Sequence, residues 1–359
     1  MLDAISRSMQ TPRDKLISVI IPSLHRPDLT RSCIESLAKQ NLSADQWEVV
    51  VVENDARPDS ILQDPLPLNT RRLLLNANYG TAGATNQGIA ETSSKYVLLL
   101  NNDVEVKPDF LPILVSVLER DERCAFAVGK LLNAKDKVRL DGAGDALLLG
   151  GGAYRLGHGD PDTGQFDGEF PVLGGCGAAA LFRRAVLEKI QGLDEDFFAY
   201  LDDVDLALRS HLFGYRGLYV PLAVAYHIGS ATLGERLHPK IVELVTRNQL
   251  SLVVKNYPFW TLVQLLPRIL AFQILWFGFV VPKGSVTPYL RGIGGAIRFL
   301  PRMIRKRRQI VAHRRITCAE FLSLLRASEG QIYAWHKARP LASHSILLRI
   351  YFGLFGAPQ

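Results

Sequence analysis

Short, continuously apolar runs recur along the first two thirds of this chain, and several of them end abruptly in polar residues. Continuous rather than alternating apolar residues are typical of strands that are buried on both faces. Between them, apolar residues recur at helical spacing, as at Leu29, Cys33 and Leu37. This alternation predicts a mostly parallel sheet that helices cover on both faces. The predicted strands are 17–22, 47–52, 71–75, 95–100, 124–128, 178–182, 215–220 and 223–227, and the predicted helices include 28–40, 82–92, 108–120 and 184–190.

The polar residues after these runs are the first candidates for a functional site. Glu53–Asp55 follows the second predicted strand, Asn76–Gly80 the third and Asn101–Asp103 the fourth. Open α/β sheets bind ligands at the C-terminal ends of their strands, so these segments are expected to meet there. The turn after the first strand, Pro22–Arg26, contains no glycine. It therefore lacks the GxGxxG motif of a dinucleotide-binding domain, and no P-loop motif is present.

Three carboxylates crowd into four positions at Asp202, Asp203 and Asp205. Like charges repel one another, so a helix N-terminus, a metal or a catalytic task must offset the cost. The structural alternative is that one acid caps a helix while Asp205 pairs with Arg209 one turn later. A cap needs only one acid, which leaves another carboxylate for chemistry.

Asp103 and His227, which both follow apolar strands, are candidate ligands of a divalent metal. Mg²⁺ and Mn²⁺ take oxygen ligands and bridge phosphates, so these residues suggest an enzyme that handles a diphosphate through a metal. Asn101 and Asn102 can orient a ribose or a sugar. The alternatives are that Asn101–Asp103 is an ordinary turn and that His227 is structural.

Charge divides the chain into two parts. Residues 1–234 carry a net −8 and residues 235–359 a net +15, which together give +7. We expect an N-terminal tail (1–15), a catalytic domain (16–234) and a basic, apolar helical region (235–359). Such a region suggests an anionic membrane surface as partner. Few aromatic residues interleave its basic run, so no nucleic-acid partner is expected.

The segment 258–281 is apolar and long enough to cross a bilayer. Arg268 near its middle disfavours a span and Pro267 adds a kink, so we expect helices that lie in the membrane interface. A spanning helix and a buried core helix are the alternatives. Residues 1–15 lack the apolar core of a signal peptide, so the expected location is the cytoplasmic face of the cell membrane.

Over about Leu16–Thr232 the chain resembles the inverting family 2 glycosyltransferases, especially their rhamnosyltransferase-like branch. The motifs that carry the resemblance are VIIPSLHRPDLTRSCIESL, VVVVENDA, NANYGTAGATNQGIAETSSKYVLLLNNDVEVKPDFL and GAAALFRRAVLEKIQGLDEDFFAYLDDVDLALRSHLFGYRGLYVPLAVAYHIGSAT. The resemblance implies an α/β fold of the GT-A nucleotide-diphospho-sugar transferase type, here with a membrane-associating helical extension. It also implies transfer of a sugar from a nucleoside-diphosphate donor, with dTDP-rhamnose suggested by the branch. The acceptor would be a hydroxyl of a glycan or lipid-linked molecule in cell-envelope polysaccharide synthesis.

The resemblance further implies a role for each residue by its position. Asp203 would be the catalytic base with Asp202 beside it, and Asp103 and His227 would bind Mg²⁺ or Mn²⁺. The residues implied in binding the donor are Pro22, Ser23, Arg26, Glu53, Asp55, Asn78, Gly80, Asn86, Asn101, Asn102, Gly175 and Cys176. The chain departs from the family pattern at Asn101, where the DxD motif has its first acid, and at Glu53, where aspartate is more usual.

Two alternatives belong to other functional classes. A nucleotidyltransferase would normally need a glycine-rich, basic first turn, and Pro22–Arg26 offers only His25 and Arg26. A non-enzymatic scaffold could bind a membrane or nucleic acid through the basic region, but the acidic motifs of the first part weaken that reading.

Overall fold

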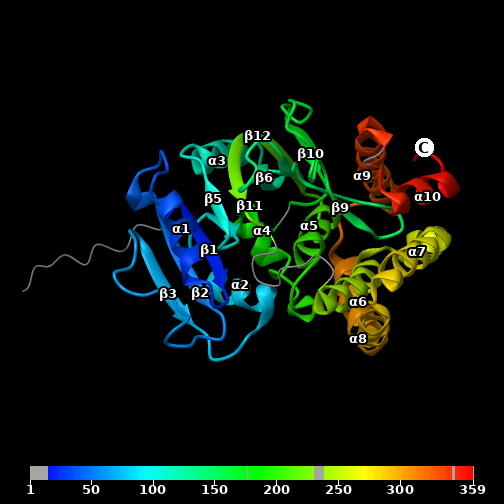
Figure 1. The fold of residues 1–359 in the computed structure, drawn as a ribbon, viewed down its shortest axis with the longest axis horizontal. Coiled ribbons are helices and arrows are strands. Elements are labelled where there is room, and N and C mark those ends of the chain that lie inside the picture. The colour runs from blue at the N-terminus through cyan, green and yellow to red at the C-terminus, as the bar shows by residue number, and fades with distance from the viewer. Residues whose placement is uncertain (1–14, 176, 230–237, 342–343, 359) are drawn as a thin grey trace, which may run out of the picture.

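The computed structural model describes residues 15–175, 177–229, 238–341 and 344–358, and Figure 1 shows a sheet layer beside a group of C-terminal helices. The strands are β1 (Ile17–Ser23), β2 (Trp47–Glu53), β3 (Thr70–Leu74), β4 (Tyr96–Leu100), β5 (Val104–Val106), β6 (Cys124–Asn133), β7 (Leu140–Gly142), β8 (Asp145–Leu147), β9 (Ala153–Arg155), β10 (Phe170–Val172), β11 (Ala179–Arg183) and β12 (Arg216–His227). The helices are α1 (Pro27–Leu37), α2 (Gly80–Ala90), α3 (Phe110–Arg120), α4 (Arg184–Lys189), α5 (Asp202–Leu212), α6 (Pro239–Asn256), α7 (Phe259–Val280), α8 (Val286–His313), α9 (Cys318–Ala338) and α10 (Ile346–Phe355).

The main sheet has the strand order β10-β12-β6-β11-β4-β1-β2-β3. β1 runs parallel to β2 and β4, and β6 runs parallel to β12, whereas β11 is antiparallel to both of its neighbours. The predicted α/β fold with a mostly parallel sheet is therefore confirmed. The parallel registers align Ser23 with Glu53, which brings the C-terminal ends of β1 and β2 to one edge.

Alternate residues of the strands pack on opposite faces of the sheet, as continuous apolar runs predict. On one face Val19 and Val49 pack with α1 and α3, and on the other Val50 and Val52 pack with α2, α4 and α5. The runs predicted at 215–220 and 223–227 are a single strand, β12. A register shift between Val220 and Val224 accommodates the extra residues around Pro221, which explains the interruption in the apolar pattern.

The C-terminal helices share a hydrophobic core with the sheet domain. One buried cluster joins Leu147 of β8 and Val204 of α5 to Leu252, Leu265 and Leu325 of α6, α7 and α9. The β8–β9 hairpin is also anchored by polar contacts, because the Leu147 N–H donates to Ser328 Oγ of α9 at 2.7 Å. The helical region thus packs directly under the acidic start of α5, and Figure 1 shows α6 beside α5.

Candidate active site

The ends of β1 and β4 meet through Thr30 of α1. Ser23 Oγ and Thr30 Oγ1 are 2.9 Å apart, and Asn102 Nδ2 donates to Thr30 Oγ1 at 3.2 Å. Asn101 extends the link to β11, since its N–H donates to Ala178 O at 2.9 Å. Three residues predicted from strand ends are therefore brought to one place, next to the predicted metal ligand Asp103.

Glu53 and Asp55 at the end of β2 both contact protein groups. Glu53 is buried, and its Oε1 accepts from the Leu62 N–H at 2.8 Å, which holds the loop that follows β2. Burial raises the pKa of Glu53. Asp55 Oδ2 lies 2.6 Å from Arg57 Nη2 and 3.4 Å from His25 Nε2. Both acids thus shape the β1–β2 edge of the site through their neighbours.

Asn54, which the sequence analysis did not select, fixes the loop that precedes α2. Its Oδ1 accepts from the Tyr79 N–H at 2.8 Å, and its Nδ2 donates to Asn78 Oδ1 at 3.0 Å and Gly80 O at 3.2 Å. Gly80 has φ of +72°, and a Cβ there would lie 2.2 Å from the Phe198 carbonyl oxygen. Only glycine fits this position, where the α2 loop touches the loop before α5.

Asn86 of α2 makes a second link to the segment before α5. Its Oδ1 accepts from the Leu193 N–H at 2.9 Å, while its Nδ2 donates to Leu193 O at 2.9 Å and Glu195 Oε1 at 3.0 Å. In this structure its amide is therefore used to position the 192–195 loop.

Asp103 and His227 are brought together although they are far apart in sequence. β5 pairs with β12 so that Val104 lies opposite His227, and Asp103 Oδ1 lies 3.3 Å from His227 Nε2. His227 Nδ1 lies 2.7 Å from Oδ2 of Asp141 on β7. Burial disfavours the charged imidazole, but the two carboxylates more than offset this and raise the pKa of His227 to about 9.

This pair could hold a divalent cation, whose binding would displace the proton from the His227 imidazole, because histidine binds a metal in its neutral form. Asp141 holds the Nδ1 side of His227, so Nε2 faces Asp103, which is the usual arrangement of a carboxylate behind a metal-binding histidine. Among the residues that the structure describes, no three His, Cys, Asp or Glu side chains form a metal-binding group. The two side chains would therefore need oxygens of a bound diphosphate, and water, to complete the coordination.

The three acids at the start of α5 have different surroundings. Asp205 is fully buried and pairs with Arg209 at 2.8 Å and Lys255 at 2.7 Å, so its predicted structural pairing with Arg209 is confirmed. Asp203 is partly exposed, and its Oδ2 accepts from the Gly177 N–H at 2.8 Å. Asp202 is buried, and burial followed by the charge of Asp203 raises its pKa to about 8.

Two further acids join the site from the glycine-rich stretch after β6. Arg155 of β9 lies 2.6 Å from Asp141 and 3.8 Å from Asp145 of β8. Burial raises the pKa of Asp145 to about 7, with Arg155 opposing the shift and Asp203 adding to it. Neither Asp141 nor Asp145 was among the predicted site residues, and two acids among glycines were the only signal for them in the sequence.

Gly175, one of the residues implied in binding the donor, lies just before the segment that leads into β11. Gly175 packs closely on β6, because a Cβ there would lie 2.2 Å from Val128 Cγ1. A Cβ on Gly177 would lie 3.0 Å from Asp203 Cβ, so glycine allows the loop to approach the carboxylate. Cys176 lies outside the described residues.

A strained loop leads into α5. Phe198, Tyr200 and Leu201 all have positive φ, at 66°, 66° and 64°, which non-glycine residues rarely adopt. Asn248 of α6 donates to carbonyl oxygens along this loop, and Arg247 Nη2 donates to Phe197 O at 2.7 Å. The C-terminal helices thus hold the loop that presents Asp202 and Asp203, a role that local sequence does not reveal.

Comparison with known proteins finds a matching family and several relatives. Residues 18–191 match the family model described as Glycosyl transferase family 2. The chain is 32% identical over 209 residues to the O-antigen biosynthesis protein RfbC of Myxococcus xanthus, a match covering 56% of this chain and 16% of that protein. It is 28% identical over 215 residues to the N-acetylglucosaminyl-diphospho-decaprenol L-rhamnosyltransferase of Mycobacterium tuberculosis, covering 53% of this chain and 70% of that one.

The fold is similar to that of solved glycosyltransferase structures. A crystal structure of GalNAc-T7 with UDP, GalNAc and Mn²⁺ aligns with a TM-score of 0.59 and 13% identity, covering 82% of this chain and 55% of that one. The chain spans only 16% and 26% of the length of the first two curated relatives that it matches.

Proposed function

Because the chain belongs to glycosyltransferase family 2, we propose that it transfers a sugar, with inversion, from a nucleoside-diphosphate sugar to an acceptor hydroxyl. The observation that carries the proposal is a buried Asp103–His227 pair, 3.3 Å apart. Asp141 and Arg155 connect this pair to Asp145, whose pKa the charge of Asp203 at the start of α5 helps to raise. The Asp103–His227 pair would supply a place for a metal and a diphosphate, and the α5 carboxylates would supply a base for the acceptor.

Asp203 is the proposed general base. It would take the proton of the acceptor hydroxyl as that oxygen attacks the anomeric carbon and the diphosphate leaves from the opposite face. The Gly177 and Val204 N–H groups, each at 2.8 Å, would hold the carboxylate in orientation. Burial, followed by the charge of Asp203, raises the pKa of Asp202 to about 8, so Asp202 keeps its proton at neutral pH and is not assigned the role of base. Such a base contributes about 10²–10⁴-fold to the rate.

Asp103 and His227 are the proposed ligands of Mg²⁺ or Mn²⁺. When bound, the cation would neutralise charge on the departing diphosphate. Asp141 supports this role by holding His227 Nδ1 at 2.7 Å, which keeps Nε2 directed toward Asp103.

The donor pocket is proposed to lie along the ends of β1, β2 and β4. Hydrogen bonds that join Ser23 to Asn102 through Thr30 support this location. The residues proposed to line it are Pro22, Ser23, Arg26, Glu53, Asp55, Asn78, Gly80, Asn86, Asn101, Asn102, Gly175 and Cys176. The mycobacterial relative is an N-acetylglucosaminyl-diphospho-decaprenol L-rhamnosyltransferase, which supports dTDP-rhamnose as donor and a lipid-linked glycan as acceptor. Both would belong to cell-envelope polysaccharide synthesis.

We propose that 16–234 is the catalytic part and that 235–359 associates with the cytoplasmic face of the membrane. Within the described residues, α7 with the turn after it, Phe259–Lys283, is long and apolar enough to cross a bilayer. However, one face of α7 is buried against the protein through Leu265, Ile269 and Phe272, and Arg268 pairs with Glu329 at 2.8 Å. These contacts favour a helix that lies in the membrane interface over one that spans it.

The test is a thermal-shift screen of nucleotides and nucleotide sugars with and without Mn²⁺, followed by product analysis. Glycosyl transfer or donor hydrolysis releases a nucleoside diphosphate, whereas nucleotidyl transfer releases pyrophosphate. Asp203→Asn should lower turnover by about 10²–10⁴-fold while donor binding survives. Asp109→Asn, at the start of α3, is the matched control and should retain turnover. Near-normal turnover of Asp203→Asn would remove Asp203 from the role of base.

A further inference from the structure

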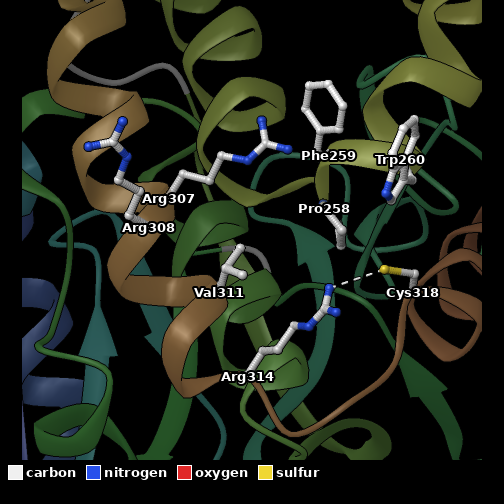
Figure 2. Close-up of a pocket in the computed structure, with 8 residues that line it drawn as sticks. All are labelled: Pro258, Phe259, Trp260, Arg307, Arg308, Val311, Arg314 and Cys318. Atoms are coloured by element: carbon white, nitrogen blue, oxygen red, sulfur yellow. Dashed lines mark hydrogen bonds between the residues drawn. The ribbon is translucent and has the colours of Figure 1, made fainter.

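A pocket of about 310 Å³ lies between the start of α7, the end of α8 and the start of α9 (Figure 2). The residues that line it are Pro258, Phe259, Trp260, Arg307, Arg308, Val311, Arg314 and Cys318. Three arginines and no carboxylate line this pocket, so its lining is strongly cationic. Figure 2 shows Arg307 extending toward Phe259 and Arg314 toward Cys318.

Two of the pocket's guanidinium groups carry N–H donors that lack a strong hydrogen-bond acceptor among the described residues. In the described structure, the salt bridges of α8 are made by Arg302 and Lys306, before the pocket begins. Arg307 Nη1 donates to the Val254 carbonyl at 3.3 Å, but its Nη2 is buried without a hydrogen-bond partner among the described residues. Arg314 Nη1 reaches only the Cys318 sulfur, at 3.2 Å, which is a weak acceptor. A buried guanidinium donor with no acceptor, such as Arg307 Nη2, suits an anion, and the fork geometry of arginine matches phosphate.

An apolar stripe begins at the same pocket. Phe259 and Trp260 are 59% and 72% exposed at the start of α7, and Val263, Leu266 and Leu270 continue the exposed face along the helix. Their spacing is that of one helix face. Aromatic residues with an apolar body are typical of the membrane interface. A ligand with an anionic head and an apolar chain would therefore meet both halves of this surface, which free phosphate would not.

We propose that this pocket binds the phosphate of an anionic membrane lipid, whose chain lies along the exposed stripe of α7. The proposal rests on the proposed association with a membrane, but it is independent of the donor and of the transfer reaction. It assigns to Arg307 and Arg314 a specific contact, whereas the other basic residues of α8 would contribute only general attraction to an anionic surface.

The first experiment separates a pocket from diffuse charge. Full-length protein is floated with phosphatidylcholine vesicles that contain or lack phosphatidylglycerol. General attraction of two arginines to an anionic surface is worth about thirtyfold in binding, so loss of a specific contact in Arg307→Gln/Arg314→Gln should weaken binding to the anionic vesicles by clearly more than about thirtyfold. The control Arg298→Gln/Arg305→Gln removes the same charge from exposed positions of α8 outside the pocket and should have a clearly smaller effect. Equal losses in the two variants, or equal binding of wild type to both vesicles, would overturn the proposal.

A second pair of variants guards against misfolding of the arginine variant. Val311→Glu puts a carboxylate into the pocket, and Ile304→Glu puts one on the same helix outside it, at positions 41% and 40% exposed. Only Val311→Glu should abolish the preference for phosphatidylglycerol, and both variants should keep wild-type hydrolysis of the nucleotide sugar. Unchanged vesicle binding of Val311→Glu would refute the site. Inorganic phosphate should not displace the vesicles, and displacement by phosphate alone would show a site for the free anion instead. If the wild-type protein does not hydrolyse the nucleotide sugar, the proposed function is contradicted, whereas the vesicle-binding result still supports the lipid site.

Discussion

Replacing Asn248 by alanine should slow turnover although the residue lies on α6, outside the sheet domain. Its Nδ2 lies 3.0 Å from Phe197 O, 2.9 Å from Ala199 O and 2.7 Å from Tyr200 O, and the side chain is fully buried. Two N–H donors can satisfy two of these carbonyls well. The Phe197 carbonyl keeps its bond from Arg247, whereas the part-buried carbonyls of Ala199 and Tyr200 lose their protein donor and are partly compensated by water, so the free energy of unfolding should fall by about 1–3 kcal/mol.

The effect on turnover should exceed the effect on nucleotide binding. The loop contains three left-handed residues, each costing about 1–3 kcal/mol, and it keeps this conformation because its surroundings hold it. Without Asn248 the loop can relax and displace Asp203. A displacement of about 1 Å in a reacting group can cost roughly 10²-fold in rate. We therefore expect kcat to fall about 10²-fold, while the Kd of the nucleoside diphosphate, measured by calorimetry, changes little.

Two controls decide whether this reasoning holds. Asn248→Asp keeps the side-chain shape and removes both N–H donors, so it should lose as much kcat as the alanine variant. Leu114→Ala removes a buried side chain from α3, which costs a comparable 2–5 kcal/mol or so, and should leave kcat unchanged below its melting temperature. If Asn248→Ala keeps wild-type kcat, or if Leu114→Ala loses as much, the loop is not held for catalysis by this residue.

Three further outcomes can be measured. Asp103→Ala and His227→Ala should each weaken Mn²⁺-dependent binding of nucleoside diphosphate in calorimetry, and the double variant should add little; full activity in excess EDTA would contradict this. Burial, followed by the charge of Asp203, raises the pKa of Asp202 from 3.8 to about 8. Between these two pH values the native state keeps a proton that the unfolded state has lost. The free energy of unfolding therefore falls as pH rises through this range. Asp202→Asn should therefore raise Tm at pH 7, with a gain that shrinks toward pH 4; a gain independent of pH would refute the assignment. Gly80→Ala should lower Tm more than Gly159→Ala. Both glycines have positive φ, but only a Cβ on Gly80 would meet backbone, 2.2 Å from the Phe198 carbonyl oxygen. Equal decreases in Tm would show that the positive φ alone, and not this close approach, accounts for the loss of stability.

The parts of the fold that sequence predicts are those set by local patterns. The strands are continuous apolar runs, and the pairing of Asp205 with Arg209 follows from their spacing on one helix. The meeting of Asp103 and His227 follows from the rule that strand ends gather at one edge. Asp141 and Asn54 escape prediction because their importance depends on where a side chain points after long-range packing, and a single sequence does not contain that information.

The charge of the C-terminal region shows why an interpretation from composition alone is incomplete. Net charge predicts a surface that attracts anions, but Lys255 is buried between Asp194 and Asp205, 2.7 Å from each. Removing one partner of a buried ion pair typically costs about 3–5 kcal/mol, so loss of α6 would leave Asp194 and Asp205 without their shared cation. The same helix carries Asn248 against the loop before α5 and offers the Val254 carbonyl to Arg307. The basic region is therefore part of the structure that holds the proposed catalytic carboxylates, and only its exposed arginines remain as candidates for contact with a membrane.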